Sequence, residues 1–508
     1  MKKIMKFLTH RLFIIGLFLL IQIIALVIAV TQFEDYLVQF YFFMIIIGFM
    51  LILKIINNKD NPSYKIAWII PILTIPIFGT LFYLILGNKS NRKKDKRLKQ
   101  INEKLKNNLK QDEKILKQLK SDNLDAYNQA KYLLNNNYPT YQNTSIEYLK
   151  IGQIYFENLK KELNQAKHFI FLEYFIINNG KMWSEILEIL KEKAKNGVDV
   201  RIIYDDMGCI TTLPARYYNF LKKYNIKAYP FNKFVPILSS KLNNRDHRKI
   251  VVIDGKVGFT GGINLADEYI NEITRFGYWK DNGIMLKGEA VFSLTVMFLT
   301  IWDYITKQNE DYNKFKPNYY EIDEYKTDGY VIPFDDNPLD EEKVGETVYL
   351  NLINKAKRYI YITTPYLILD NEMEMALKIA AKSGIEVKII TPGIPDKKAV
   401  NEVTKAYYNN LIESGIKIYE YTPGFIHEKM IIVDDLYAIV GTINLDYRSF
   451  YLHFECGVLL YKNSSIKQIK KDYENTLLES KEIFIKDTKI RFLRGLKRAI
   501  LRLFAPLM

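Results

Sequence analysis

The sequence predicts an α/β protein made of two homologous halves, packed about a pseudo-two-fold axis and preceded by N-terminal transmembrane helices. Three observations support this prediction: strand-like segments that occur twice, a polar motif that also occurs twice, and long apolar runs gathered within residues 1–87. At 508 residues the chain is too long for one ordinary core, so two or three domains are expected. Homologous halves usually pack like the subunits of a symmetric dimer.

Residues 1–87 are expected to form a membrane anchor. Two apolar runs, 12–30 and 36–53, have spanning length, since about 20 apolar residues cross a bilayer core. A cleaved signal peptide is the alternative for the first run, but no small-residue cleavage site follows it. A third uncharged run, 66–87, is interrupted by prolines and either spans or re-enters the bilayer.

Charged residues predict the orientation of this anchor. Basic residues precede the first run and follow the second, whereas the loop between them is acidic. Both flanks of the hairpin are therefore expected on the cytoplasmic side, which makes the chain a multi-pass protein with a cytoplasmic catalytic part. A basic cluster follows the third run, and re-entry would keep that cluster inside, near anionic lipid.

The formal net charge of +15 favours anionic partners, which are nucleic acid, anionic lipid headgroups or acidic substrates. The chain has 2 cysteines, Cys209 and Cys456, which are far apart. Their spacing excludes a disulfide framework and a cysteine-based zinc site.

After the anchor, residues 88–140 read as a basic linker or helix on the membrane surface, or as a plain exposed helix. The first globular half is expected at 141–325 and the second at 326–485. Residues 486–508 form a basic amphipathic tail, which lies either on the bilayer or on the protein's own surface.

Each half begins with strand, helix and strand. The strand-like runs are short and rich in β-branched and aromatic residues, and a glycine follows each helical pattern where a C-cap would lie. This order predicts largely parallel sheets covered by helices. The repeated strand-like pairs are 166–175 with 356–365, 196–203 with 383–390, and 224–229 with 414–419; the helical patterns are 182–195 and 372–382.

The pattern His-x-Lys-x4-Asp also occurs twice, and each copy is followed by an asparagine at the same spacing. One copy would be a weak match, but the chain has only 5 histidines and two of them head identical patterns. On a strand, the histidine and lysine would share one face, and each asparagine is expected where a helix begins, a favourable place for anions. Two copies in register predict one composite active centre. Its residues are His247, Lys249, Asp254 and Asn264 in the first half, and His427, Lys429, Asp434 and Asn444 in the second.

These residue types suit the exchange of phosphodiesters. The lysines and asparagines would neutralise the non-bridging oxygens of a phosphate. One histidine can attack phosphorus and hold it covalently, while the other protonates the leaving alkoxide and deprotonates the incoming alcohol. Each histidine needs a partner on its second ring nitrogen, and Asp281 and Glu455 are the carboxylate candidates.

No cofactor or metal is required by this scheme, because the lysines supply the positive charge. The pairs Asp205-Asp206 and Asp434-Asp435 could be read as magnesium ligands. Aspartates in turns are far commoner, so no metal is predicted.

The doubled motif resembles the hallmark of the phospholipase D superfamily. Segments 66–87, 363–366, 424–429, 441–450 and 504–507 resemble those of bacterial cardiolipin synthases. The resemblance implies transfer of a phosphatidyl group from one phosphatidylglycerol to another, which gives cardiolipin and glycerol in a bacterial cell membrane rich in anionic phospholipids.

The resemblance also implies roles for the motif residues. His247 becomes the nucleophile and His427 the acid and base, while the lysines and asparagines bind phosphate. Asp254 and Asp434 become structural supports. Two positions depart from the family pattern: Gly283 stands where many members have histidine, and His453 where asparagine is common.

The sequence offers three rival functions. A nuclease of the same superfamily fits the positive charge, but nucleic acid needs no membrane anchor. A non-catalytic membrane scaffold would not need intact copies of every motif residue. A phospholipase or transphosphatidylase that uses water or another alcohol as acceptor stays open, and no oligomeric state is predicted.

Overall fold

A computed structural model describes residues 37–87, 103–234, 243–317, 329–339 and 342–507, together with positions 20, 21, 24, 27 and 28. Most of the first apolar run, expected at 12–30, therefore lies outside the described residues, and all the basic residues that precede it do.

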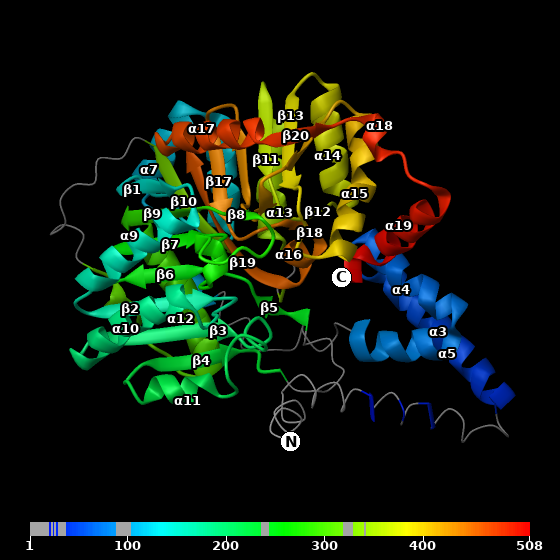
Figure 1. Cartoon of the computed structure of the whole chain (residues 1–508), viewed down its shortest axis with the longest axis horizontal. Coiled ribbons are helices and arrows are strands. Elements are labelled where there is room, and N and C mark those ends of the chain that lie inside the picture. Colours follow the sequence, from blue (N-terminus) through cyan, green and yellow to red (C-terminus); the bar gives the residue numbers. More distant parts are fainter. Residues whose placement is uncertain are drawn as a thin grey trace.

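The first half contains a seven-stranded sheet with the order β1-β9-β7-β6-β2-β3-β4 (Figure 1). Its strands are β1 (Thr144–Leu149), β2 (Phe169–Tyr174), β3 (Asp199–Asp205), β4 (Lys227–Phe231), β6 (Ile250–Ile253), β7 (Val257–Gly261) and β9 (Gly283–Gly288).

The second half repeats this order as β10-β19-β17-β16-β11-β13-β14 and adds β20 at the edge. The equal strand order confirms that the two halves are homologous in fold. The strands are β10 (Tyr330–Asp336), β11 (Tyr359–Thr363), β13 (Glu386–Pro392), β14 (Lys417–Tyr421), β16 (Met430–Val433), β17 (Tyr437–Gly441), β19 (His453–Tyr461) and β20 (Ser480–Ile483).

The sheets are mixed, so the prediction of largely parallel sheets was wrong. Along the two strand orders only β2-β3-β4 and β11-β13-β14 run parallel, and the other neighbours are antiparallel. The short strand β5 (Arg245–Asp246) also joins β19 in parallel. The cause is a tight turn after each motif strand. Asp254 and Gly255 adopt φ of 51° and 66°, and Asp434 and Asp435 adopt 58° and 60°. Such left-handed turns make hairpins, which pair their strands antiparallel.

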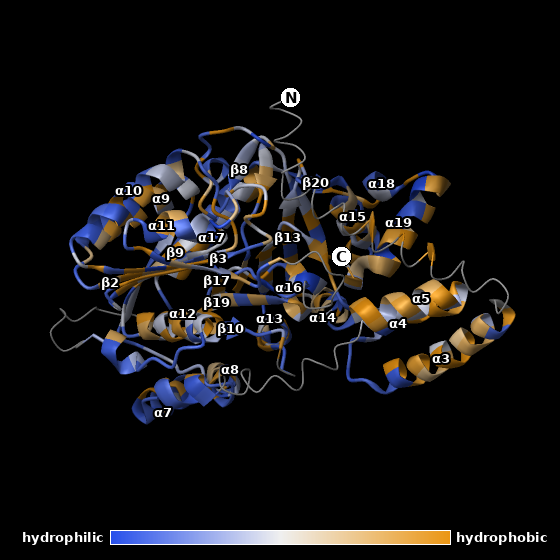
Figure 2. Cartoon of the chain, turned by 90° about the horizontal axis from the view of Figure 1, so that it is seen from below, coloured by the Kyte–Doolittle hydropathy of each residue, from blue (hydrophilic) through white to orange (hydrophobic). Residues whose placement is uncertain are grey.

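Helices cover both faces of the sheets (Figure 2). α10 and α14 confirm the helical patterns expected at 182–195 and 372–382. Gly197 and Gly384 follow them with φ of 87° and 92°, the left-handed geometry that favours glycine after a helix. The main helices are α9 (Gly152–Gln165), α10 (Lys181–Lys195), α12 (Val291–Thr306), α13 (Val344–Lys355), α14 (Asn371–Lys382), α15 (Lys398–Ile412) and α17 (Ser465–Leu478).

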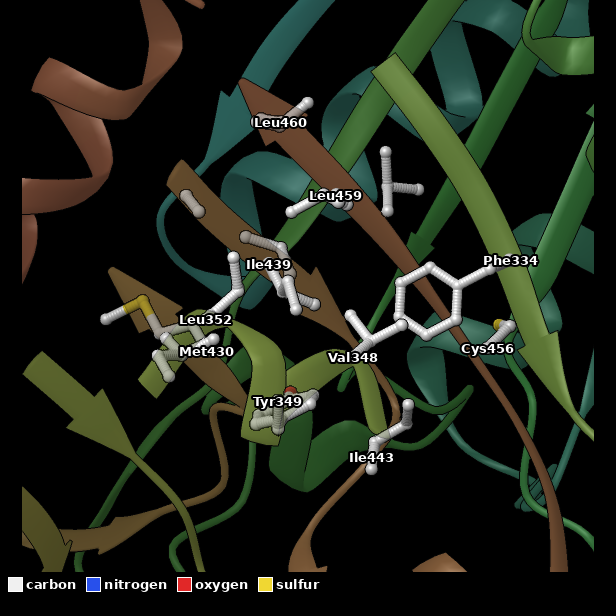
Figure 3. Packing of buried hydrophobic residues seen from close by; sticks show 14 of the residues in the cluster. Phe334, Val348, Tyr349, Leu352, Met430, Ile439, Ile443, Cys456, Leu459 and Leu460 are labelled. Carbon is white, nitrogen blue, oxygen red and sulfur yellow. The ribbon is translucent and has the colours of Figure 1, made fainter. Parts of the chain in front are cut away.

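One large hydrophobic cluster takes residues from both halves and makes them a single body. The sheets approach each other where β7 and β9 contact β17 and β19. Figure 3 shows part of this core, in which Phe334 of β10 and Val348 of α13 lie beside Ile439 and Leu459. The cavity described below lies between these two halves, so packing of the core fixes the geometry of the site.

The segment expected as a solvated linker at 88–140 is instead packed against the protein over its described part. α7 (Glu113–Asp122) and α8 (Leu124–Asn135) form two amphipathic helices. Leu119, Ala130 and Leu133 are buried in the large cluster, because the spaced leucines of this lysine-rich stretch share one face of each helix.

Among the described residues, one helix is long and apolar enough to cross a membrane, Val38–Asn57 within α3 (Leu37–Asn57). The next apolar run forms α4 (Pro62–Thr74), α5 (Pro76–Phe82) and the π-helical turn η2 (Tyr83–Gly87). This run doubles back on itself at Ile75, so its two ends meet. The Tyr64 hydroxyl donates to the Gly87 carbonyl at 3.5 Å.

The chain ends in α18 (Ile485–Thr488), α19 (Phe492–Phe504) and η7 (Ala505–Leu507). α19 packs against α15 and α4. The described part of the expected tail at 486–508, which is residues 486–507, is therefore largely helical and docked on the protein.

Candidate active site

The two motif histidines line one cavity of about 940 Å³. Its wall also contains Asn264 and Asn444, one from each half. Both histidines are 7% exposed. Both copies of the motif thus meet at one place, the arrangement that a composite active centre requires.

Each histidine is held by the opposite half of the protein. The backbone N–H of His247 donates to the carbonyl of Phe454 in β19 at 2.9 Å, and that of His427 donates to the carbonyl of Lys280 at 2.7 Å. Lys280 ends β8 (Tyr278–Lys280), which pairs with β15 (Gly424–Ile426) just before His427.

The carboxylate partners are also exchanged between halves. His247 Nδ1 lies 2.9 Å from Glu455 Oε2, and His427 Nδ1 lies 2.6 Å from Asp281 Oδ2. Asp281 follows His247 in the sequence and Glu455 follows His427, but each carboxylate binds the histidine of the other half. Each carboxylate accepts a hydrogen bond from Nδ1–H, which leaves Nε2 of the neutral ring as the nitrogen with the free lone pair.

Burial lowers the pKa of both His247 and His427 well below the ordinary value, and the motif lysines lower it further. Both imidazoles are therefore neutral at neutral pH in the substrate-free protein. A neutral imidazole is the form that attacks phosphorus or removes a proton from a hydroxyl.

The two motif lysines are buried and lie close to the histidines. Lys249 Nζ donates to the carbonyl of His247 at 2.6 Å, and Lys429 Nζ donates to the carbonyl of His427. Burial lowers the pKa of Lys249 to about 8 and that of Lys429 to about 7. An anion in the cavity would favour the charged form of both amines and bind to them in turn.

The asparagines contribute side-chain amides and not helix ends, so the expected helix starts were misplaced. η4 (Asp267–Ile270) begins after Asn264, and α16 (Tyr447–Tyr451) begins after Asn444 and is capped by the side chain of Asp446. The residues between each asparagine and its helix stay extended, so each helix begins farther along the chain than expected. Asn264 itself accepts from Ile176 N at 3.0 Å and donates to the Tyr269 hydroxyl at 2.7 Å.

Asp254 and Asp434 are not in the wall of the cavity. Asp254 accepts three backbone N–H groups where β2 begins, at 2.8 Å each, and Asp434 accepts three where β11 begins. Each carboxylate fixes the turn after its motif strand. Their geometry is that of structural supports and not of groups that touch a substrate.

Among the described residues, possible metal ligands come together at two places. Two groups bring three ligand atoms close together: His247 with His453 and Glu455, and Glu346 with Asp370 and Glu372. The turn aspartates named as magnesium candidates, Asp205-Asp206 and Asp434-Asp435, belong to neither group.

His453 is a site residue whose role sequence reasoning missed. It lines the cavity, its ring centroid lies 5.4 Å from that of His247, and its Nδ1 lies 3.6 Å from Glu455 Oε1. Burial lowers its pKa to about 3. The available signal was its position two residues before Glu455, because alternate residues of a strand share one face.

A second feature missed in the sequence is the buried charge beside each motif histidine. Arg248 Nη1 donates to Asp335 Oδ2 of the other half at 3.1 Å. Lys280 Nζ lies 3.0 Å from Glu428 Oε1 and 3.0 Å from Asp472 Oδ2, both in the other half. Burial raises the pKa of Glu428, and Lys280 opposes that rise. These ion pairs join the halves directly behind the site.

The cavity wall around His427 is aromatic. The ring centroids of Tyr269, Trp279 and Phe425 lie 5.5, 5.5 and 5.7 Å from that of His427. On the other side, the Phe175 ring lies 5.0 Å from His247. These rings limit the access of water to the reacting nitrogens.

Paired histidines, crossed carboxylates and buried lysines around one cavity define an enzyme that exchanges phosphodiester bonds, the chemistry of the phospholipase D superfamily. Comparison with known families narrows this class. Residues 159–291 and 349–477 each match the family described as "Cardiolipin synthase, PLD-like domain", and residues 45–88 match "Phospholipase_D-nuclease N-terminal". The chain belongs to the cardiolipin synthase family and is an enzyme of it.

Similar proteins agree with this assignment. A cardiolipin synthase of Halalkalibacterium halodurans is 35% identical over 474 residues, which cover 91% of this chain and 92% of the relative. An uncharacterized protein of Streptococcus mutans is 48% identical over 434 residues, covering 85% of this chain and 94% of the relative.

Among solved structures, phosphatidylserine synthase of Haemophilus influenzae matches with a TM-score of 0.56 and 18% identity, covering 75% of this chain and 97% of that one. At this identity the match shows a shared fold.

Proposed function

We propose that the enzyme transfers a phosphatidyl group from one phosphatidylglycerol to a second, releasing glycerol and forming cardiolipin. The observation that carries the proposal is the pair of histidines on one cavity, each with its Nδ1 against a carboxylate of the other half. Relatives that are named cardiolipin synthases support the choice of lipid.

In the first step, His247 Nε2 attacks the phosphorus atom of the donor lipid. Binding of the anionic phosphate beside His427 raises the pKa of this ring, which takes up a proton at Nε2. The bond from phosphorus to the glycerol oxygen then breaks, and protonated His427 gives this proton to that oxygen as it leaves. The phosphatidyl group is then held on His247 as a phosphohistidine. Glu455 stabilises the positive charge that His247 gains during the attack, because its carboxylate accepts the hydrogen bond from Nδ1–H of the ring.

In the second step, His427 takes the proton from a hydroxyl of the second phosphatidylglycerol. The hydroxyl oxygen attacks phosphorus, the bond to His247 breaks, and cardiolipin leaves. His247 is then neutral again and His427 protonated again, the states that the two rings had when the donor was bound. Asp281 orients His427 through its Nδ1 and stabilises the charge that the ring gains.

The non-bridging oxygens would be held by Lys249, Lys429, Asn264 and Asn444. Both lysines are buried, so their attraction for an anion is weakly screened. The scheme uses no metal, since these groups supply the charge that a divalent ion would supply elsewhere.

The aromatic wall around His427 favours a lipid alcohol over water as the acceptor, because it is apolar where the acceptor must enter. Hydrolysis to phosphatidic acid is the competing outcome. It would use the same two histidines.

We also propose the setting of the reaction. The apolar run at 12–30 and α3 would cross a bacterial cell membrane, and the folded-back α4–α5–η2 segment would enter and leave it on one side. The catalytic part would lie on the cytoplasmic face, with anionic phospholipids as partners and no nucleic acid.

The test is to incubate the purified full chain with phosphatidylglycerol labelled in its headgroup and in an acyl chain. We expect equal amounts of cardiolipin and free glycerol, and no product from His247→Ala. If phosphatidic acid is the main lipid product, the enzyme is a phospholipase and not a synthase. If the folded protein gave no labelled product from either label, both the synthase and the phospholipase would be contradicted.

A further inference from the structure

The C-terminal helix α19 is amphipathic, and its arginines face the protein. Arg498 Nε donates to Glu402 Oε2 of α15 at 2.7 Å, and Arg494 binds the same carboxylate. Arg502 donates to Glu374 of α14 at 3.0 Å. Arg498 is only 7% exposed. The charged side of α19 is thus fixed to the surface of the second half.

The opposite side of α19 is apolar and exposed. Phe492 is 82% exposed, Leu493 78%, Leu496 51% and Ile500 50%. A helix docked on a water-soluble surface normally shows the reverse arrangement, with its apolar side inward. A contiguous apolar stripe on the outside of a protein marks a contact with a partner or a membrane.

This apolar side continues onto the N-terminal helices. α19 contacts α4, and η7 contacts both α4 and α16. Leu507 packs against the small hydrophobic cluster formed by α3, α4 and η2. On α3, Phe42 is 65% exposed. Figures 1 and 2 show α19 beside α4, with α3, α4, α5 and α19 on the same side of the globular part.

We propose that α19 is a second membrane contact of this enzyme, lying along the bilayer surface with its apolar side among the acyl chains. Two observations favour a bilayer over a second copy of the chain. The stripe lies on a helix that packs against α4, which in turn packs against the helix of spanning length, Val38–Asn57. Exposed basic residues, Arg491 and Lys497, flank the stripe and suit anionic headgroups, whereas they would repel another chain with a net charge of +15.

The contact also reaches the active site. Ala505, in the turn directly after α19, lines the catalytic cavity together with Tyr447 and Arg448 of α16. A helix held in the bilayer surface would therefore keep this edge of the cavity at the lipid, where both substrates are found. An effect of this contact on turnover rests on the proposed function, but the membrane contact itself does not.

The contact is tested by depth measurement on the full chain in lipid nanodiscs that contain phosphatidylglycerol. Both native cysteines are buried, so an environment-sensitive dye attaches selectively to Leu496→Cys. Phe42→Cys in α3 is the positive control. Leu478→Cys in α17 is the matched control, an exposed leucine (86%) away from the N-terminal helices.

We expect blue-shifted emission at position 496 and quenching by spin-labelled acyl chains at least half as strong as at position 42. Position 478 should show neither effect. Emission at 496 that matches 478, or a blue shift without quenching that accompanies dimerisation, would overturn the proposal.

Turnover gives a second test. Leu496→Glu combined with Ile500→Glu should lower turnover of vesicle phosphatidylglycerol at least fivefold, but leave turnover of a monomeric short-chain phosphatidylglycerol within twofold. Leu478→Glu should change neither. Equal losses on both substrates would contradict the membrane role. If the unmodified chain turns over no phosphatidylglycerol while position 496 is still quenched, the proposed function fails and the membrane contact stands.

Discussion

Glu455 Oε2 lies 2.9 Å from His247 Nδ1, although the two residues belong to different halves of the protein. The same carboxylate also accepts from the Thr442 hydroxyl at 2.5 Å. Neither half can therefore orient its own histidine. This dependence explains why the duplicated halves share one core and act as one enzyme.

Removal of the charge on Glu455 should impair the attack on phosphorus. Glu455→Gln keeps the shape of the side chain but loses the carboxylate that accepts the hydrogen bond from Nδ1–H. We therefore expect kcat to fall roughly 10³- to 10⁴-fold. Steady-state turnover and rapid-quench detection of the phosphohistidine measure this effect. A fall of less than tenfold would contradict the role of Glu455.

Asp281→Asn should behave differently, because its partner His427 acts on the leaving group. The loss should be large with phosphatidylglycerol. When the leaving group is p-nitrophenol, which needs no proton, the loss of rate in forming the covalent intermediate should be at least ten times smaller than with phosphatidylglycerol. Equal losses with both substrates would contradict the assignment of His427 as the acid.

The lysine pKa values predict an alkaline limb for kcat/KM. Burial lowers the pKa of Lys249 to about 8 and of Lys429 to about 7. A lysine is charged below its pKa, so the free enzyme loses attraction for the phosphate as pH rises through this range. kcat/KM should fall above about pH 7, and kcat only at higher pH, because the bound anion favours the charged amines. A kcat/KM that rises up to pH 9 would contradict the role of the lysines.

His453 should tolerate substitution. Its pKa of about 3 keeps the ring neutral, so it is a poor proton donor at neutral pH. We expect His453→Asn to retain turnover within about tenfold, in contrast to the complete loss in His247→Ala. Parallel assays at equal amounts of folded protein compare the two. Complete loss of turnover in His453→Asn would show that this ring takes part in the reaction.

The buried ion pairs behind the site should stabilise the contact between the halves. Lys280→Met leaves Glu428 and Asp472 without their common partner, and a broken buried pair costs about 3–5 kcal/mol. Thermal or denaturant unfolding in detergent measures the loss. The control is Lys181→Met, which removes an exposed pair with Glu272 and should change stability little. Equal effects would contradict the buried network.

Local patterns in the sequence were sufficient for much of the fold. The paired strands, the helices at 182–195 and 372–382 and the composite cavity depend on residues close in sequence or repeated in register. The crossed pairing of His247 with Glu455 depends on how the halves pack, which no local pattern encodes. The burial of α7 and α8 was missed for a similar reason, since their charge suggested solvent while Leu119 and Leu133 pack onto the core.

The sequence also could not predict which side of the C-terminal helix faces the protein. Its arginines suggested contact with anionic lipid, but Glu402 and Glu374, far away in the chain, bind them instead. Motif residues outside the chemistry, such as Asp254, could be assigned only once their backbone partners were known.

The most direct test of the account is to find which histidine carries the phosphatidyl group. His427→Ala, supplied with a donor whose leaving group is p-nitrophenol, should accumulate the covalent enzyme because the second step lacks its base. Acid-free digestion and mass spectrometry should then find the adduct on His247, and none should form in His247→Ala. An adduct on His427 of the unmodified enzyme would reverse the two roles, and turnover with no histidine adduct under any of these conditions would contradict the mechanism.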